Sequence, residues 1–263
     1  RNRKGKGSMI KSSGLTLIEI LVTIFILALI AGSLLTAYGF SFRHNYEAES
    51  LLKASFVAQT KMEELQSMDA LSAFNAGRDQ RKQDASGYYV QSLCQPYFSD
   101  DYHLFSVVLK DKGGEGSGYM MYAVPPEGRN LLLIEDVRND TVVNLSMADK
   151  SYSMAVQGSG QAAINGSLAD DGKKVMILIN AVEYSGNHHM TFNINPGGKM
   201  VEVKVYDTDE NLNTLTVSGV SEQRLSNFIY RNYSMIRASV RVFEGETDAQ
   251  PKAVIESILQ LEN

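Results

Sequence analysis

An uncharged stretch near the start of the chain, from Ile20 to Phe42, most constrains what this protein can fold into. It is long enough to cross the roughly 30 Å hydrocarbon core of a membrane as a single helix. One carboxylate, Glu19, comes directly before it, and a charge in that setting costs roughly 2.5–3.5 kcal/mol on insertion scales. A chain keeps such a residue when another group neutralises it, so Glu19 is a candidate functional residue.

The charges that flank this stretch are asymmetric. Because cytoplasmic flanks carry an excess of Lys and Arg, the pattern predicts a cytoplasmic N-terminus and an extracytoplasmic remainder. Without the five basic residues before Glu19, the chain has 20 Lys and Arg against 30 Asp and Glu, so overall charge gives no reason to expect nucleic-acid binding by the head. The five residues are Arg1, Arg3, Lys4, Lys6 and Lys11.

A helical pattern continues beyond the uncharged stretch. No proline interrupts residues 15–70, so we expect one helix there, about 84 Å long at 1.5 Å per residue. Its first part, residues 15–42, is apolar all round and is the predicted transmembrane part. Its second part is amphipathic, because apolar and small residues recur at helical spacing. That stripe contains Ala48, Leu51, Leu52, Ser55, Ala58, Met62 and Leu65.

The rest of the chain changes character. Residues 71–87 are polar and contain glycine, which predicts a loop. From residue 88 to 263 many short apolar runs alternate with turn residues, which predicts an antiparallel β-rich head. The fold class is therefore α+β, with a long N-terminal helix before the head. Strands are expected at 88–93, 104–109, 119–124, 131–134, 152–156, 175–180, 190–194, 200–206, 215–217, 236–243 and 253–261.

Two pairings are expected within the head. Met190–Ile194 and Met200–Tyr206 are joined by the turn sequence Asn195–Lys199, which predicts a hairpin. The last two strands are expected to pair with each other in antiparallel fashion. The pattern favours one domain; a division into two would fall at Asp170–Gly172 or between residues 207 and 213.

Residues 12–22, with the sequence SSGLTLIEILV, resemble the N-terminal signature of type IV pilins and type II secretion pseudopilins. The resemblance implies that a prepilin peptidase cuts the basic leader, residues 1–14, after Gly14. Leu15 then becomes a methylated mature N-terminus. The new α-amine lies four residues before Glu19 and is the charge that would neutralise it, within or between subunits.

The same resemblance implies how the chain is used. Glu19 registers the subunit in a filament, and Thr16, Leu17 and Ile18 belong to the assembling segment. The expected partners are other pilin subunits, the prepilin peptidase, the assembly platform and the membrane. The chain is then a single-pass membrane protein before assembly, with its head extracytoplasmic, and later part of a pilus at the cell surface.

Several features depart from the family pattern. Leu15 stands where phenylalanine or methionine is more frequent, and Gly32 and Gly39 are the only weak points where major pilins often have a proline. Met9 is an alternative start that would leave Met9–Gly14 as the leader. By family analogy, the large head favours a low-copy minor pilin or pseudopilin. Pilus function, protein secretion and DNA uptake all remain open.

The main alternative is a signal-anchored extracytoplasmic binding or adhesion protein that does not polymerise. It gives no reason for Glu19. A cleaved secretory signal peptide fits less well, because its apolar core is usually only about 7–15 residues long and ends at a small-residue cleavage site.

The head offers no convincing catalytic or metal-binding motif, so neither an enzyme nor a cofactor is predicted. Cys94 is the only cysteine and is expected to be a small buried apolar residue. The His188–His189 pair lacks further ligands for zinc. The segment 207–213 begins like a calcium loop, but Leu212 replaces the required glycine and Ser218 the final glutamate. The glycine-rich segment 113–118 matches no phosphate-binding pattern.

Overall fold

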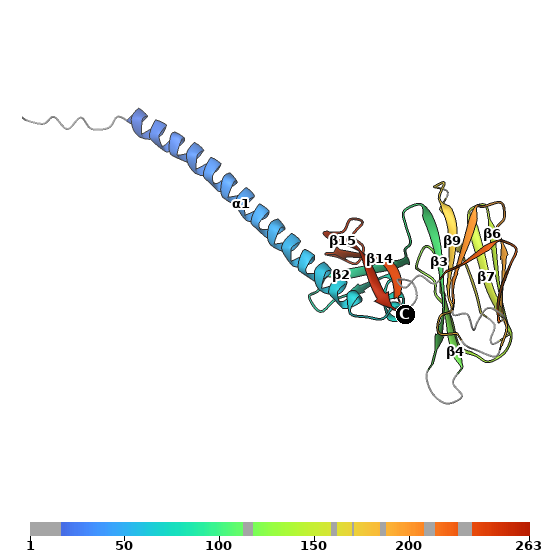
Figure 1. Ribbon diagram of the computed structural model, residues 1–263. Coiled ribbons are helices and arrows are strands. Elements are labelled where there is room, and N and C mark those ends of the chain that lie inside the picture. The colour runs from blue at the N-terminus through green and yellow to red at the C-terminus, as the bar shows by residue number, and fades with distance from the viewer. Residues whose placement is uncertain are drawn as a thin grey trace, which may run out of the picture. The chain divides into compact units, whose positions relative to one another are not determined.

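The computed structural model describes residues 17–112, 118–158, 162–169, 171–184, 188–207, 214–225 and 233–263. The chain falls into two compact units that divide between Leu52 and Lys53. A long apolar helix precedes a β-rich part, which confirms the predicted fold class (Figure 1). The head forms one unit, and neither of the two divisions considered from the sequence separates it.

The first helix, α1, spans Leu17–Gln66 and continues through both Gly32 and Gly39. The second helix, α2, spans Ala70–Ala76 and begins at Asp69, whose carboxylate accepts a hydrogen bond from Ser72 N at 2.9 Å. This bond satisfies one of the amides that a helix N-terminus leaves unpaired.

The prediction of a loop over residues 71–87 was wrong. Most of α2 and the whole of strand β1 (Arg78–Gln83) lie there. The sequence pattern indicated neither element, because α2 is short and β1 is an edge strand that lacks apolar alternation.

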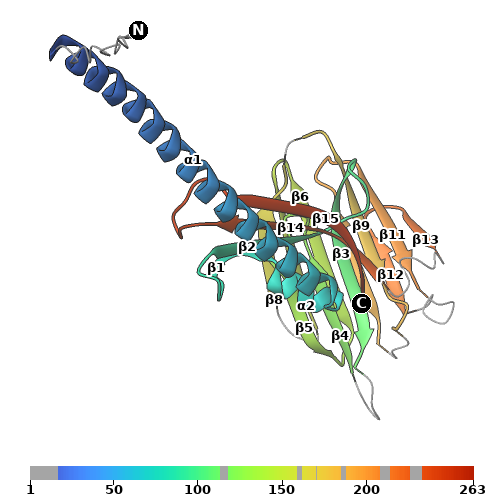
Figure 2. The ribbon, with the colours of Figure 1, turned by 90° about the vertical axis from the view of Figure 1, so that its left-hand side faces the viewer.

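A four-stranded antiparallel sheet, in the order β1-β2-β14-β15, contains both early and late parts of the chain. Its other strands are β2 (Tyr89–Pro96), β14 (Tyr233–Phe243) and β15 (Ala253–Glu262). The pairing of β14 with β15 confirms the predicted closing pair. β2 pairs directly with β14, so strands β3–β13 are an insertion between two neighbouring strands (Figure 2).

The insertion forms two further sheets, and Figure 1 shows β3 and β9 in one layer and β6 and β7 in the other. The six-stranded sheet has the order β13-β11-β9-β3-β4-β5, and the five-stranded sheet the order β12-β10-β6-β7-β8. The strands are β3 (Tyr102–Asp111), β4 (Tyr119–Val124), β5 (Leu132–Val137), β6 (Thr141–Ala148), β7 (Ser151–Gln157), β8 (Ala162–Ser167), β9 (Lys174–Asn180), β10 (Met190–Asn195), β11 (Val201–Tyr206), β12 (Leu215–Ser218) and β13 (Glu222–Leu225).

Each of these two sheets is mixed. Strands β3–β5 and β6–β8 are antiparallel meanders, and from β9 onward the chain alternates between the sheets. Each later strand then pairs in parallel with a strand already in its own sheet. The predicted hairpin of residues 190–194 and 200–206 was therefore wrong. The turn between them carries the chain from one sheet to the other.

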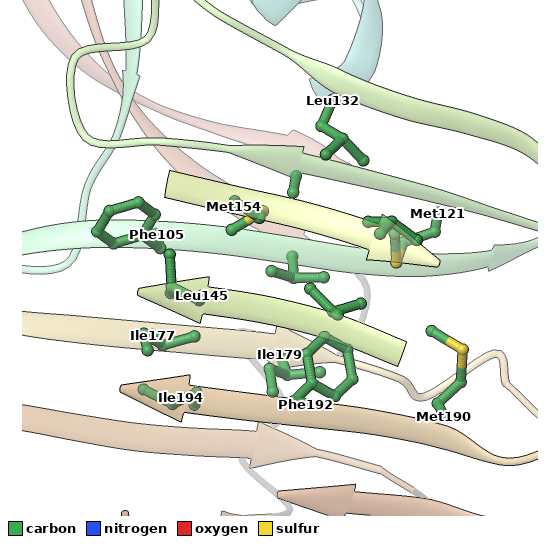
Figure 3. Close-up of a cluster of buried hydrophobic side chains, with 14 of the residues drawn as sticks. Phe105, Met121, Leu132, Leu145, Met154, Ile177, Ile179, Met190, Phe192 and Ile194 are labelled. Atoms are coloured by element: carbon green, nitrogen blue, oxygen red, sulfur yellow. The ribbon is translucent and has the colours of Figure 1, made fainter. Parts of the chain in front are cut away.

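The main core lies between the six-stranded and five-stranded sheets. Figure 3 shows side chains of both sheets that meet there, including Phe105 and Ile177 from one and Leu145 and Phe192 from the other. Alternation explains the placement, because every second residue of a strand faces the same side.

A second core joins α1, α2 and the four-stranded sheet. Ala58, Met62 and Leu65 are buried there, as the predicted stripe required, whereas Leu51 and Leu52 of the same stripe are exposed. Tyr122 of β4 enters this second core, while its neighbour Met121 enters the main core. Strand β4 is therefore buried on both faces and connects the insertion to the rest of the head.

Candidate functional site

Leu17, Ile18 and Glu19, which the resemblance predicts to take part in assembly, lie at the start of α1. Leu17 and Ile18 begin the helix and are exposed, and Glu19 lies in its first turn. A carboxylate in the first turn interacts favourably with the helix dipole. Gly14, Leu15 and Thr16 lie outside the described residues, so the structure gives no geometry for the cleavage site.

The surface of α1 between Glu19 and Phe42 is apolar and exposed. Leu27, Leu35 and Phe42 are 67%, 73% and 73% exposed. Residues 20–42 span about 35 Å as a helix, more than the hydrocarbon core requires. Within the described part of the chain, α1 is the one helix long and apolar enough to cross a membrane.

Three hydroxyl groups in this stretch find acceptors within the helix itself. Thr23 Oγ1 donates to the carbonyl oxygen of Glu19 at 2.6 Å, and Thr36 Oγ1 donates to that of Gly32 at 2.9 Å. Ser33 Oγ donates to the carbonyl oxygen of Ile30 at 2.8 Å. Because lipid offers no hydrogen-bond partners, internal satisfaction suits these residues to a membrane or to the apolar core of a helix bundle.

Charged groups reappear at Arg43. Its Nε lies 2.9 Å from Glu47 Oε1, and both side chains are exposed. An exposed pair at this spacing adds only about 0.3–0.5 kcal/mol to helix stability. Arg43 instead marks where the uncharged stretch ends, since that stretch lies between Glu19 and Arg43.

Cys94 lies in β2 of the four-stranded sheet and is fully buried in the second core. Burial raises the pKa of its thiol to about 12, so the thiol is protonated at neutral pH. A nucleophilic cysteine needs the thiolate. The expectation that Cys94 is a small buried apolar residue is confirmed.

The two histidines considered for a metal site have backbone roles. His188 accepts a hydrogen bond at its carbonyl oxygen from Tyr184 Oη at 2.8 Å, and His189 donates its amide to Asp140 Oδ1 at 2.8 Å. They precede β10 rather than lying within a strand. Across the described ranges, no group of three or more His, Cys, Asp or Glu is placed to hold a metal ion.

The calcium-like segment falls largely outside the described residues, but its first residue is placed. Asp207 is almost fully buried and forms an ion pair with Arg224. Arg224 also donates to Glu222 at 2.9 Å and to the carbonyl oxygen of Leu215 at 2.7 Å. Arg224 thus links Asp207 and the last strands of both sheets, β12 and β13. Sequence reasoning missed Arg224, because nothing in its local pattern indicates a partner in another strand. The glycine-rich segment 113–117 also lies outside the described residues.

The aromatic residues of the head are divided between core and surface. Tyr122 is fully buried, whereas Tyr97 and Phe98 are half-buried. The Arg237 guanidinium lies 4.6 Å from the Tyr97 ring centre, and Lys204 Nζ lies 4.4 Å from that of Phe98. These cations already cover one face of each ring.

No protein-family model, curated protein or solved structure matches this chain. The functional interpretation therefore depends on the N-terminal sequence and on the properties of α1.

Proposed function

We propose that this chain is a structural subunit of a type IV pilus-like filament, as a minor pilin or pseudopilin. The observation that supports this most strongly is the composition of α1. This helix of 50 residues exposes apolar side chains along its N-terminal half. Glu19 is its only charged residue before Arg43, and it lies five positions after Gly14.

The proposed chemistry begins with cleavage after Gly14. The cut releases an α-amine at Leu15, and this amine and the Glu19 carboxylate both enter the apolar interior of the filament. Pairing the two charges offsets much of their desolvation cost. Removing one partner of a buried pair typically costs about 3–5 kcal/mol. Processing and assembly are thereby coupled, because the uncut chain has no amine at Leu15.

The proposal also gives an order of events. Before cleavage the chain is a single-pass membrane protein with its basic leader in the cytoplasm and its head outside. After cleavage, α1 leaves the lipid and packs against the same helix of other subunits. The hydroxyl groups of Thr23, Ser33 and Thr36 need no change of partner, because they are already bonded within α1.

Mass spectrometry of the chain's N-terminus tests the first step. In cells that express a prepilin peptidase, we expect the mature chain to begin at Leu15 with a methylated amine. A chain that retains its leader in such cells would exclude the proposal. That result would favour the alternative, a signal-anchored binding protein that does not polymerise.

Replacement of Glu19 tests the second step. Glu19→Gln keeps the shape and removes the charge, so we expect incorporation into filaments to fall at least tenfold, while the amount of protein in the membrane stays the same. Glu47→Gln is the matched control, because Glu47 lies on the same helix beyond the uncharged stretch and is exposed. Normal incorporation of the Glu19→Gln chain would exclude the charge pairing.

A further inference from the structure

The four-stranded sheet has two edges, β1 and β15, that pair with no further strand among the described residues. β15 is the longer edge, with 10 residues, and its register with β14 runs from Ala253 to Glu262 without a bulge. It contains neither proline nor lysine. A long, regular edge without these residues readily pairs with another strand.

The outward face of β15 carries apolar side chains. Val254 and Ile258 are 49% and 48% exposed, whereas Leu259 and Leu261 on the other face are buried in the second core. A strand placed beside β15 would shield both exposed side chains from water. Pairing of strands and burial of apolar surface therefore favour the same contact.

The two edges of the sheet carry opposite charges. β15 contains Glu256 and Glu262 and no basic residue, whereas β1 contains Arg78, Arg81 and Lys82 and a single acidic residue. That acidic residue is Asp79, which already forms an ion pair with Arg129 at 2.7 Å. The charge that β1 presents is therefore positive.

Charges of opposite sign on the two edges lie on one face of the sheet. Through the register of the four strands, Arg81 lies on the same face as Glu256 and Glu262, whereas Lys82 lies on the face of the second core. Opposite charges on neighbouring strands stabilise a sheet, and like charges directly opposite each other destabilise it. A second β15 is thus a poor partner for β15, and β1 is a good one.

The strand directions fit the same partner. The four strands alternate in direction, so β1 and β15 run in opposite directions. A second copy in the same orientation therefore places its β1 antiparallel to β15 of the first. We propose that β15 of one copy pairs with β1 of a second copy, so that the four-stranded sheets of successive subunits join head to tail. This arrangement depends on the proposed function in one respect, because it requires copies that repeat in one orientation.

The proposed contact is short. A bulge between Arg78 and Arg81, where Asp79 has a φ of 62°, restricts the regular register of β1 to Arg81–Gln83. A contact of this length needs a high local concentration of copies. Anchoring in one membrane supplies it, because tethered partners meet at a raised effective concentration.

Cysteine cross-linking of the full-length chain in membranes tests the proposal. Gln83 of β1 and Ile258 of β15 are exposed and face the side of the sheet away from the second core. With a flexible bismaleimide, the double variant Gln83→Cys/Ile258→Cys is expected to give a ladder of covalent dimers, trimers and larger species. Each single variant and the parent chain are expected to give none, since Cys94 is fully buried.

Charge reversal provides the specific control. In the double-cysteine chain, changing Glu256 and Glu262 to Lys should reduce the ladder at least fivefold, whereas Lys82→Glu, which lies on the opposite face of β1, should leave it unchanged. A double variant that gives no ladder would overturn the proposal, as would dimers formed by Ile258→Cys alone, which would reveal pairing of two β15 strands. The ladder should also form in cells without a prepilin peptidase, so its absence is distinct from a failure of cleavage after Gly14.

Discussion

The amide of Cys94 donates a hydrogen bond to the carbonyl oxygen of Gly77 at 2.9 Å, and the two residues are in close contact. A β-carbon on Gly77 would lie only 2.4 Å from Cys94 Sγ and 2.7 Å from Cys94 N. Gly77 follows α2 directly, so this contact fixes the end of α2 against β2. A side chain of any size at position 77 would separate the two elements.

Replacement of Gly77 by alanine should therefore destabilise the head. We expect Gly77→Ala to lower the free energy of unfolding by about 1–3 kcal/mol, the usual cost of overpacking a core. Thermal unfolding of the full-length chain in detergent measures it. Gly39→Ala is the control, because a β-carbon there meets nothing within 4 Å. Equal unfolding temperatures for Gly77→Ala and the parent chain would contradict the close contact.

The raised pKa of Cys94 predicts a dependence of stability on alkaline pH. Below pH 9 the thiol is protonated in both states, because its ordinary pKa is 9.0 and burial raises the folded value to about 12. Between these values the unfolded chain loses the proton first, so the free energy of unfolding falls as pH rises. The slope approaches about 1.4 kcal/mol per pH unit for one group.

The contribution of Cys94 is measured as a difference, because buried tyrosines such as Tyr184 also have a raised pKa. This difference is obtained from denaturant unfolding of the parent chain and of Cys94→Ala at about pH 8 and about pH 10.5. We expect the parent chain to lose more stability than the variant over this interval. Identical losses would show that the thiol ionises equally in both states.

Two neighbouring glycines in the turn between β10 and β11 should respond differently to substitution. Gly197 and Gly198 both have positive φ, 56° and 85°. A β-carbon on Gly197 would lie 1.9 Å from the carbonyl oxygen of Met147, whereas one on Gly198 meets nothing within 4 Å. Backbone strain alone costs about 1–2 kcal/mol for an alanine in this region.

We therefore expect Gly198→Ala to cost about 1–2 kcal/mol and Gly197→Ala clearly more, because the latter also displaces the backbone of β6. Unfolding midpoints of the two variants, measured side by side, give the comparison. A larger loss for Gly198→Ala would contradict the described path of the turn across the end of β6.

Arg224 should be a major contributor to the stability of the last strands. Arg224→Ala breaks the ion pair with the Asp207 side chain, and removing one partner of a buried pair costs about 3–5 kcal/mol. Hydrogen exchange should accelerate in β12 and β13 before it does so in the four-stranded sheet. Arg138→Ala is the control, because Arg138 is 73% exposed in its pair with Asp136, and its loss should change stability by at most about 1 kcal/mol. Unchanged exchange in β12 after Arg224→Ala would exclude this role.

The sequence predicted α1 and most strands because their apolar periodicity is strong. The predicted run 119–124 coincides with β4, and the closing pair was predicted with its correct partner. Strand β6 escaped notice although Val143, Leu145 and Met147 alternate, and β13 is short and polar. Weak alternation thus explains why β13 was missed, but it does not explain β6.

The arrangement of the strands could not be predicted from the same patterns. Alternation shows that Met190–Ile194 is a strand with one buried face, but it does not show which strand lies beside it. A glycine-rich turn of five residues fits a hairpin, and it equally fits a crossing between two stacked sheets. The candidate site differs in this respect, because Gly14 and Glu19 are close in sequence and need no tertiary information. Contacts between distant segments, such as Arg224 with Asp207, could not be predicted either, because local patterns do not show which segments meet.

The insertion of β3–β13 between β2 and β14 imposes an order on folding during synthesis. Pro96 of β2 pairs with Ile236 of β14, so the two partners leave the ribosome far apart in time. The two-sheet insertion can complete its main core within its own residues, whereas the second core waits for the last strands. Until then the buried face of α1 around Ala58 stays uncovered. Long-range pairings of this kind form late and leave apolar surface exposed in the interval. A chaperone that acts on the nascent head would find its binding surface there.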